Sequence, residues 1–192
     1  MKVFIIGAGG HGRVVQEILS HDKNIEIVAF VDNVSRGTDE KILGVPVVGD
    51  HGVIKDLLLE GVTGVIVAVG DNELRAEYFE QMKNMRIELL RAVHRTAHIA
   101  HNAKIGEGTV VGIGAIIATG VTIGCNVIVN TGAIVEHGST VEDHVHVAPG
   151  TVVAGAVTIG ARTFIGAGSI IKDKVSVGKN VTIGAGSVVL ED

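Results

Sequence analysis

The second half of the chain repeats a six-residue pattern without interruption. From Ile99 onward every sixth residue is Ile or Val, at positions 99, 105, 111, 117, 123, 129, 135, 141, 147, 153, 159, 165, 171, 177, 183 and 189. Four residues after each of the first fifteen of these comes only Ala, Ser, Thr or Val. A period of six with no helix between units is typical of stacked short strands.

Each six-residue unit is expected to form one flat side of a three-sided coil, with the aliphatic residue inside and the next residue at a corner. Three units then complete one turn of 18 residues. Residues one turn apart should lie one above the other at the strand spacing of about 4.8 Å. The corner residue is Gly or Ala in most units, which we attribute to the backbone angles of a sharp bend.

The first part of the chain shows alternating strand and helix patterns instead. We expect strands at 3–6, 25–31, 64–69 and 87–93 and helices at 13–19, 53–59 and 72–82. Alternation of this kind indicates a small parallel sheet. We therefore predict an α/β Rossmann-like domain over 1–93 and an all-β parallel solenoid over 94–192.

A glycine-rich turn follows the first expected strand. It has the form Gly7-x-Gly9-x-x-Gly12, and Asp32 stands twenty residues after Gly12 at the end of the second strand. Such glycines let phosphates approach backbone N–H groups at a helix start, although they could also serve only a tight turn. The domain holds about one half of a dinucleotide site, so a mononucleotide is favoured over NAD. The candidate binding residues here are Gly9, Gly10, His11, Gly12 and Asp32.

One coil of the solenoid breaks the corner rule. Asn130, Glu136 and Glu142 occupy three successive corners, and His137, His144 and His146 lie in the same stretch. Polar residues concentrated on one coil of an apolar stack indicate a site.

Stacking places further groups relative to this coil. Gly155, 18 residues after His137, is expected directly over it, where a bare backbone N–H beside an imidazole can hold an acyl carbonyl. His146 is half a turn from His137, so the two can share a pocket only across a subunit boundary. Three such three-sided solenoids packed around an axis provide boundaries of this kind, and we expect a cyclic homotrimer.

The composition argues against several classes of protein. The formal net charge of −5 does not favour nucleic-acid binding. Cys125 is the one cysteine, so an internal disulfide is excluded, and a packed or surface thiol is a better interpretation than a nucleophile. No apolar run reaches the roughly 18 residues of a membrane span, and a signal peptide is not indicated. We expect a cytoplasmic protein.

The whole chain resembles bacterial nucleotide-sugar N-acetyltransferases of the bacillosamine and perosamine type, together with the related sialic acid O-acetyltransferases. The motifs that carry the resemblance are Gly7-Ala8-Gly9-Gly10-His11-Gly12, Val31-Asp32, Val69-Gly70-Asp71-Asn72, Val129-Asn130-Thr131, Glu136-His137, Asp143-His144-Val145-His146 and Ala154-Gly155. It implies a left-handed β-helix, a first domain that holds a UDP- or GDP-linked amino sugar, and acetyl-CoA bound between subunits without a metal.

The resemblance also implies roles for single residues. His137 matches the general base, His146 belongs to the same pocket, Gly155 contacts the thioester region, and Asn130 is taken as a substrate contact. Relatives often carry Glu or Asp directly after the base, where this chain has Gly138. Glu136, Asp143 or a group across the interface is left to orient the imidazole. Relatives also continue beyond the position of Asp192 with a segment that covers the last coil.

The expected reaction is direct acetyl transfer from acetyl-CoA to the sugar amine. Histidine has an ordinary pKa near 6.5, and general-base catalysis typically contributes roughly 10²- to 10⁴-fold. Transfer to a sugar hydroxyl is the alternative of the sialic acid type. A zinc lyase of the carbonic anhydrase type is disfavoured because His101 and His137 would lie two coils, about 10 Å, apart. A non-catalytic nucleotide sensor is the third alternative.

Overall fold

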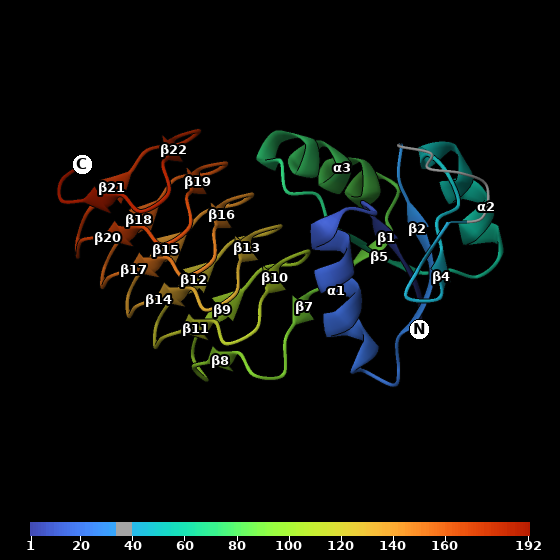
Figure 1. Ribbon diagram of the computed structural model, residues 1–192, viewed down its shortest axis with the longest axis horizontal. Helices are drawn as coiled ribbons and strands as arrows, with labels where there is room; N and C mark the ends of the chain where they lie inside the picture. The colour runs from blue at the N-terminus through green and yellow to red at the C-terminus, as the bar shows by residue number, and fades with distance from the viewer. Residues whose placement is uncertain (34–39) are drawn as a thin grey trace. The chain divides into compact units, whose positions relative to one another are not determined.

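The structure, a computed structural model, describes residues 1–33 and 40–192 and contains two compact units, Met1–Leu90 and Arg91–Asp192. Figure 1 shows the α/β unit in blue to green and the solenoid in green through yellow to red. The strand expected at 87–93 is divided between them. Its first part, β6 (Glu88–Leu89), joins the sheet of the first unit, whereas β7 (Ala92–Val93) pairs with β10 (Val110–Val111) of the solenoid.

The first unit contains a parallel sheet in the order β2-β1-β5-β6. Its elements are β1 (Lys2–Ile6), α1 (Gly10–Ser20), β2 (Glu26–Val31), η1 (His51–Val53), α2 (Ile54–Leu59), β5 (Gly64–Val67), α3 (Asn72–Asn84) and β6. An antiparallel pair that the sequence analysis did not anticipate, β3 (Lys41–Ile42) and β4 (Val45–Pro46), is also present. Val3 to Ile6 and all of β5 are buried, as is typical of strands covered on both faces.

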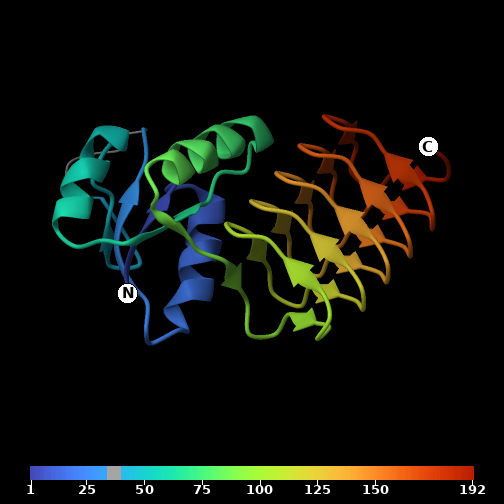
Figure 2. The same ribbon diagram turned by 180° about the vertical axis from the view of Figure 1, so that it is seen from behind.

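The second unit is a left-handed parallel β-helix with three faces. The first face contains β7, β10 (Val110–Val111), β13 (Ile128–Val129), β16 (His146–Val147), β19 (Phe164–Ile165) and β22 (Thr182–Ile183). The second contains β8 (His98–Ile99), β11 (Ile116–Ile117), β14 (Ile134–Val135), β17 (Val152–Val153), β20 (Ile170–Ile171) and β23 (Val188–Val189). The third contains β9 (Lys104–Ile105), β12 (Thr122–Ile123), β15 (Thr140–Val141), β18 (Thr158–Ile159) and β21 (Ser176–Val177). Figure 2 shows the stacked coils from behind.

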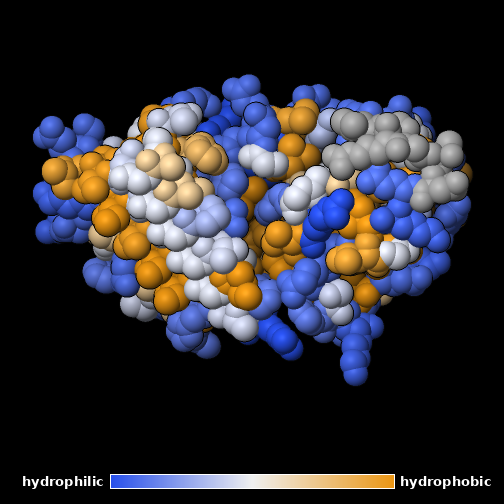
Figure 3. Space-filling model, viewed as in Figure 1, coloured by the Kyte–Doolittle hydropathy of each residue, from blue (hydrophilic) through white to orange (hydrophobic). Residues whose placement is uncertain are grey.

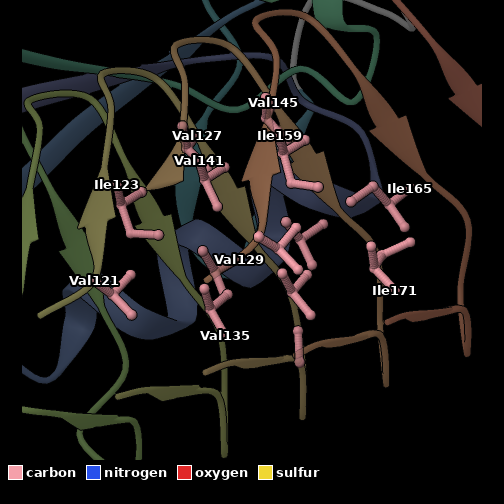
Figure 4. Packing of buried hydrophobic residues seen from close by; sticks show 14 of the residues in the cluster. Val121, Ile123, Val127, Val129, Val135, Val141, Val145, Ile159, Ile165 and Ile171 are labelled. Carbon is pink, nitrogen blue, oxygen red and sulfur yellow. The ribbon is translucent and has the colours of Figure 1, made fainter. Parts of the chain in front are cut away.

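The aliphatic residue of each repeat points inward, as predicted. Residues 111 to 171 of the series are at most 2% exposed, and they form one continuous cluster with the small residues four positions later. Figure 4 shows these side chains converging along the axis. The buried hydroxyls among them are satisfied: Thr109 Oγ1 donates to the Gly124 carbonyl of the next coil and accepts from Val127 N–H. Hydroxyl side chains such as Thr109 and Ser139 therefore enter the core with their hydrogen bonds made.

The corner glycines have a different cause from the one expected. Positive φ occurs three residues after the aliphatic residue, for example at Gly114, Gly120 and Gly132. The small residue directly after the aliphatic one instead faces the next coil. A Cβ at Gly106 would lie 2.5 Å from the Gly124 carbonyl carbon, and one at Gly112 would lie 2.8 Å from Thr131 N. Close approach of backbone to backbone, rather than the bend, favours glycine there.

The outward residues give each face its own chemistry. On the third face they are Lys104, Thr122, Thr140, Thr158 and Ser176. On the second face they form a ladder of branched aliphatics: Ile116, Ile134, Val152, Ile170 and Val188. Figure 3 shows an orange row along this face. We call these five residues the aliphatic ladder.

Within the part of the chain that the structure describes, no helix has the length and apolarity needed to cross a bilayer.

Candidate active site

The glycine turn between β1 and α1 is shaped by two close approaches. Gly7 has φ +105° and a Cβ there would lie 2.7 Å from the Ala68 carbonyl oxygen, while a Cβ at Gly12 would collide with the Gly7 carbonyl oxygen. Gly9 and Gly10 instead face open space. The two outer glycines therefore permit the turn and the helix packing, and the two inner ones leave the start of α1 accessible to a phosphate.

A pocket of about 400 Å³ opens beside this turn in the first unit. Its lining includes Gly9, Gly10, His11 and Asp32, so the structure brings these predicted residues together. Gly12 faces the Gly7 carbonyl instead and supports the turn. The carboxylate of Asp32 accepts a hydrogen bond of 2.6 Å from Ala8 N–H through Oδ2, which fixes the acidic group against the glycine turn.

The opposite wall of the pocket is held by a buried arginine that the sequence analysis did not single out. Arg75 is 1% exposed, and its guanidinium donates to the carbonyls of Val69 and Gly70 and to Oδ1 of Asn72. Burial lowers the pKa of Arg75 to about 10, an effect that the Asp71 charge opposes. Arg75 is therefore a cation at neutral pH and ties the loop before α3 to the helix.

Three further lining residues were also missed, because they come from separate segments. Asn33 follows β2, His51 lies in η1 and Tyr78 lies in α3. Asn33 Nδ2 donates to the Tyr78 hydroxyl over 3.0 Å, and the rings of His51 and Tyr78 lie 4.2 Å apart between centroids. The spacing of His51 and Tyr78 along the chain shows no link between them.

In the solenoid, His137 lies at the corner between the second and third faces, two residues after the end of β14. An ideal Cβ on Gly155 would lie 2.7 Å from Cε1 and 2.8 Å from Nε2 of this histidine. The imidazole thus occupies the space that any side chain at position 155 would need. The stacking of Gly155 over His137 that the period predicts is present, and the exposed ring is open to an incoming ligand.

The two candidate orienting carboxylates bind backbone groups. Glu136 accepts from His137 N–H at 3.2 Å, and Asp143 accepts from Cys125 N–H at 2.7 Å. Asp143 lies at the corner between the third and first faces, one corner beyond His137. Among the described residues of one chain, the structure thus directs neither carboxylate to the imidazole ring.

Asn130 and His146 form a second polar group on the same coil. Asn130 follows β13 at the corner between the first and second faces, and its Nδ2 lies 3.2 Å from Nε2 of His146. The ring of His146 packs edge-on against Phe164 with 5.1 Å between centroids. The second face therefore has His137 at one edge and the Asn130–His146 pair at the other.

The chain matches known proteins in both units. The PglD N-terminal domain matches residues 2–82, and the bacterial transferase hexapeptide (six repeats) matches residues 156–191. A structure of a histidine mutant of perosamine N-acetyltransferase from Caulobacter crescentus, in complex with CoA and GDP-perosamine, is 35% identical with a TM-score of 0.94. That match covers 100% of this chain and 90% of that one.

Two further relatives point to the same family. The acetyltransferase domain of PglB from Neisseria gonorrhoeae FA1090 is 32% identical with a TM-score of 0.90, over 100% of this chain and 92% of that one. UDP-N-acetylbacillosamine N-acetyltransferase of Bacillus subtilis (strain 168) is 32% identical over 115 residues, which are 57% of this chain and 50% of that relative. The match thus spans about half the length of the curated relative. With both units matched in full-length alignments, the chain belongs to the bacillosamine- and perosamine-type family of hexapeptide-repeat N-acetyltransferases.

Proposed function

We propose that this protein transfers the acetyl group of acetyl-CoA to the amino group of a nucleotide-linked amino sugar. The observation that carries the proposal is the pairing, in one chain, of a pocket at a glycine turn with an exposed histidine stacked on a glycine of a hexapeptide solenoid. Relatives over the full chain were crystallised with CoA and GDP-perosamine and with acetyl-CoA.

In the proposed reaction His137 is the general base. The sugar amine attacks the thioester carbonyl, the N–C bond forms as the C–S bond breaks, and the imidazole takes the proton that the amine loses. Gly155 N–H is proposed to contact the thioester carbonyl, because the absence of a side chain there lets the imidazole lie directly against the Gly155 backbone. Positioning of amine and thioester supplies a further part of the acceleration.

Glu136 is proposed to position His137 through its hydrogen bond to the His137 backbone. Asp143 is proposed to support the same coil, because its carboxylate accepts a hydrogen bond from Cys125 N–H of the preceding coil. Asn130 is proposed as a substrate contact that also holds His146, because their side chains meet at 3.2 Å.

We further propose that the enzyme is a homotrimer whose active sites lie between subunits. The aliphatic ladder supports this, because a contiguous apolar strip on one face is typical of an association surface. His137 and the Asn130–His146 pair flank that face, so a cyclic assembly through it brings one edge of each protomer to the other edge of its neighbour. The coenzyme would bind along this boundary.

The nucleotide is proposed to bind in the first unit, with its phosphates at Gly9, Gly10 and His11 and its ribose at Asp32. This order follows the usual roles of a glycine turn and of the acidic residue that ends the second strand. The lone Cys125 agrees with a cytoplasmic location, which is also a proposal.

The test is thiol release from acetyl-CoA with a panel of UDP- and GDP-linked 4-amino sugars and with sugars that offer only hydroxyl groups. We expect turnover with an amino sugar, and His137→Ala should lower kcat roughly 10²- to 10⁴-fold. His101→Ala, an exposed histidine of the same solenoid, is the matched control and should retain full activity. Turnover of hydroxyl sugars alone would replace the amine by an O-acetyl acceptor.

A further inference from the structure

The side chains of Asn130 and His146 meet on one coil of the solenoid in a fixed arrangement. Asn130 Nδ2 lies 3.2 Å from Nε2 of His146, and Asn130 Oδ1 lies 2.8 Å from the backbone nitrogen of Thr131. The backbone of Asn130 is fixed as well, because its N–H donates to the Val147 carbonyl at 2.9 Å and its carbonyl accepts from Ala133 N–H at 3.0 Å. The amide of Asn130 therefore has a defined position beside the imidazole.

The contact with Thr131 decides which way the amide of Asn130 faces. A backbone N–H can only donate, so the atom that faces it must be the carbonyl oxygen Oδ1. An amide turned over would place its NH₂ group against this N–H, with two donors in contact. Nδ2 is therefore the atom beside His146, and the hydrogen bond runs from Nδ2–H to the imidazole.

The direction of this hydrogen bond in turn fixes the tautomer of His146. Nε2 accepts, so it carries no proton, and the proton of the neutral ring lies on Nδ1. A ring turned over would present Cε1–H to the amide, and a C–H group cannot accept. The ring also packs edge-on against Phe164, with 89° between the planes and 5.1 Å between centroids, which restrains its orientation.

This arrangement leaves His146 without a place for a further proton. Nδ1 already carries one, and the lone pair of Nε2 is engaged by the amide of Asn130. Protonation at Nε2 would set N–H against N–H and would break the hydrogen bond. Asn130 therefore acts on the chemistry of His146 and not only on its position.

We propose that Asn130 is a positioning residue that holds His146 as a neutral imidazole protonated on Nδ1, and that His146 therefore does not act as a base in the transfer. The two histidines at the edges of the second face thus have different roles. His137, whose side chain is exposed, receives the proton that the attacking amine loses, whereas His146 keeps the proton that it has. The inference rests on the proposed function only in taking amine acetylation as the reaction that needs a base.

The tautomer is measured by long-range proton–nitrogen NMR correlation spectra of the full protein with isotope-labelled histidine, recorded near neutral pH without substrate. A protonated ring nitrogen and an unprotonated one differ widely in nitrogen shift, whereas both nitrogens of an imidazolium are of the protonated kind. The signals of His146 are identified by their loss in His146→Gln. We expect Nε2 of wild-type His146 to be of the unprotonated kind and Nδ1 to be of the protonated kind.

Substitutions of Asn130 should move this proton in a defined direction. In Asn130→Asp the carboxylate can only accept, so it should draw a proton to Nε2 of His146 and convert that signal to the protonated kind. Asn130→Ala removes the donor and should leave His146 as an average of both tautomers. Thiol release should fall about 10-fold or more in both variants, since a misdirected group in an active site can lower the rate about 10²-fold.

Asn180→Asp is the matched control, because it makes the same chemical change at an exposed corner of the solenoid. It should leave both the His146 spectrum and thiol release unchanged. The spectrum is the deciding measurement, because Asn130 is also a proposed substrate contact and its loss lowers thiol release in either role.

Two results overturn the inference. One is a wild-type His146 with Nε2 of the protonated kind, and the other is a wild-type tautomer that persists unchanged in Asn130→Asp. The first needs no variant and so does not depend on how the variants fold. The expected tautomer in a protein that releases no thiol upholds the role of Asn130 and rejects the proposed function, whereas thiol release by a protein with His146 protonated on Nε2 does the reverse.

Discussion

At the scale of single residues, the shape of the site depends on glycines, which have no side chain. Gly155 has no Cβ, and the His137 ring fills the volume that one would need. The same holds for Gly12, whose Cβ would meet the Gly7 carbonyl oxygen. In both units another group lies directly against the backbone of a glycine, so adding one methyl group there is a sharp probe of geometry.

Gly155→Ala should therefore impair catalysis while leaving the fold intact. The new methyl group displaces the imidazole, and a shift of about 1 Å in a catalytic group can lower the rate about 10²-fold. We expect kcat to fall by this order and nucleotide binding in the first unit to stay unchanged, as measured by thiol release and calorimetry. Gly178→Ala is the control, because its Cβ would meet Val181 at an ordinary 3.7 Å. Equal losses in both variants would indicate a general effect on the solenoid.

At the scale of elements, the loop before α3 depends on one buried cation. Arg75→Met should destabilise the first unit by about 1 to 3 kcal/mol, because the Val69 and Gly70 carbonyls lose their donor. Part of this cost is offset, since the desolvation that lowers the pKa of Arg75 to about 10 is relieved. Arg75 is protonated in both folded and unfolded chains near neutral pH, so the difference should not vary between about pH 6 and about pH 8.

Denaturant unfolding at several pH values measures this difference. Arg13→Met, on the exposed side of α1, should change stability by less than about 0.5 kcal/mol. A loss that appears only as the pH rises toward 8 would show that another group is involved.

Elements also show how far the sequence can predict this structure. Each repeat makes its own contacts with its neighbours, so the period alone predicts that Val111 through Ile171 point inward. It also predicts that Gly155 stacks on His137. The small strand β7 was misplaced, because an apolar pair such as Ala92–Val93 fits either unit until its partner strand is known. The domain boundary between residues 93 and 94 remains a prediction. In the structure, the first compact unit ends at Leu90 and the second begins at Arg91.

The contacts among Asn33, His51 and Tyr78 could not be predicted for a related reason. These residues have no common spacing along the chain, and they meet only when the first unit has folded. Corner glycines were predicted at the right positions but for the wrong cause, since contact between coils is a property of the stack and not of the bend.

At the scale of the whole molecule, the proposed trimer is tested first through the aliphatic ladder. Val152→Glu places a charge in the middle of this strip and should shift the protein from trimer toward monomer, as measured by sedimentation. Thr158→Glu, at the corresponding outward position of the third face, is the matched control and should remain assembled. Monomeric wild-type protein with full activity would contradict the proposed interface.

The assembly also has a catalytic consequence that subunit mixing measures. If each site combines His137 of one protomer with His146 of the next, His137→Ala and His146→Ala chains are both impaired alone. Co-expressed in equal amounts, they form mixed trimers in which about one interface in four carries both native histidines. We expect about a quarter of wild-type activity per site from the mixture. A double variant carrying both changes, co-expressed with either single variant, cannot regenerate a native pair and should stay inactive. Absence of recovery in stable mixed trimers would mean that each site is completed within one chain.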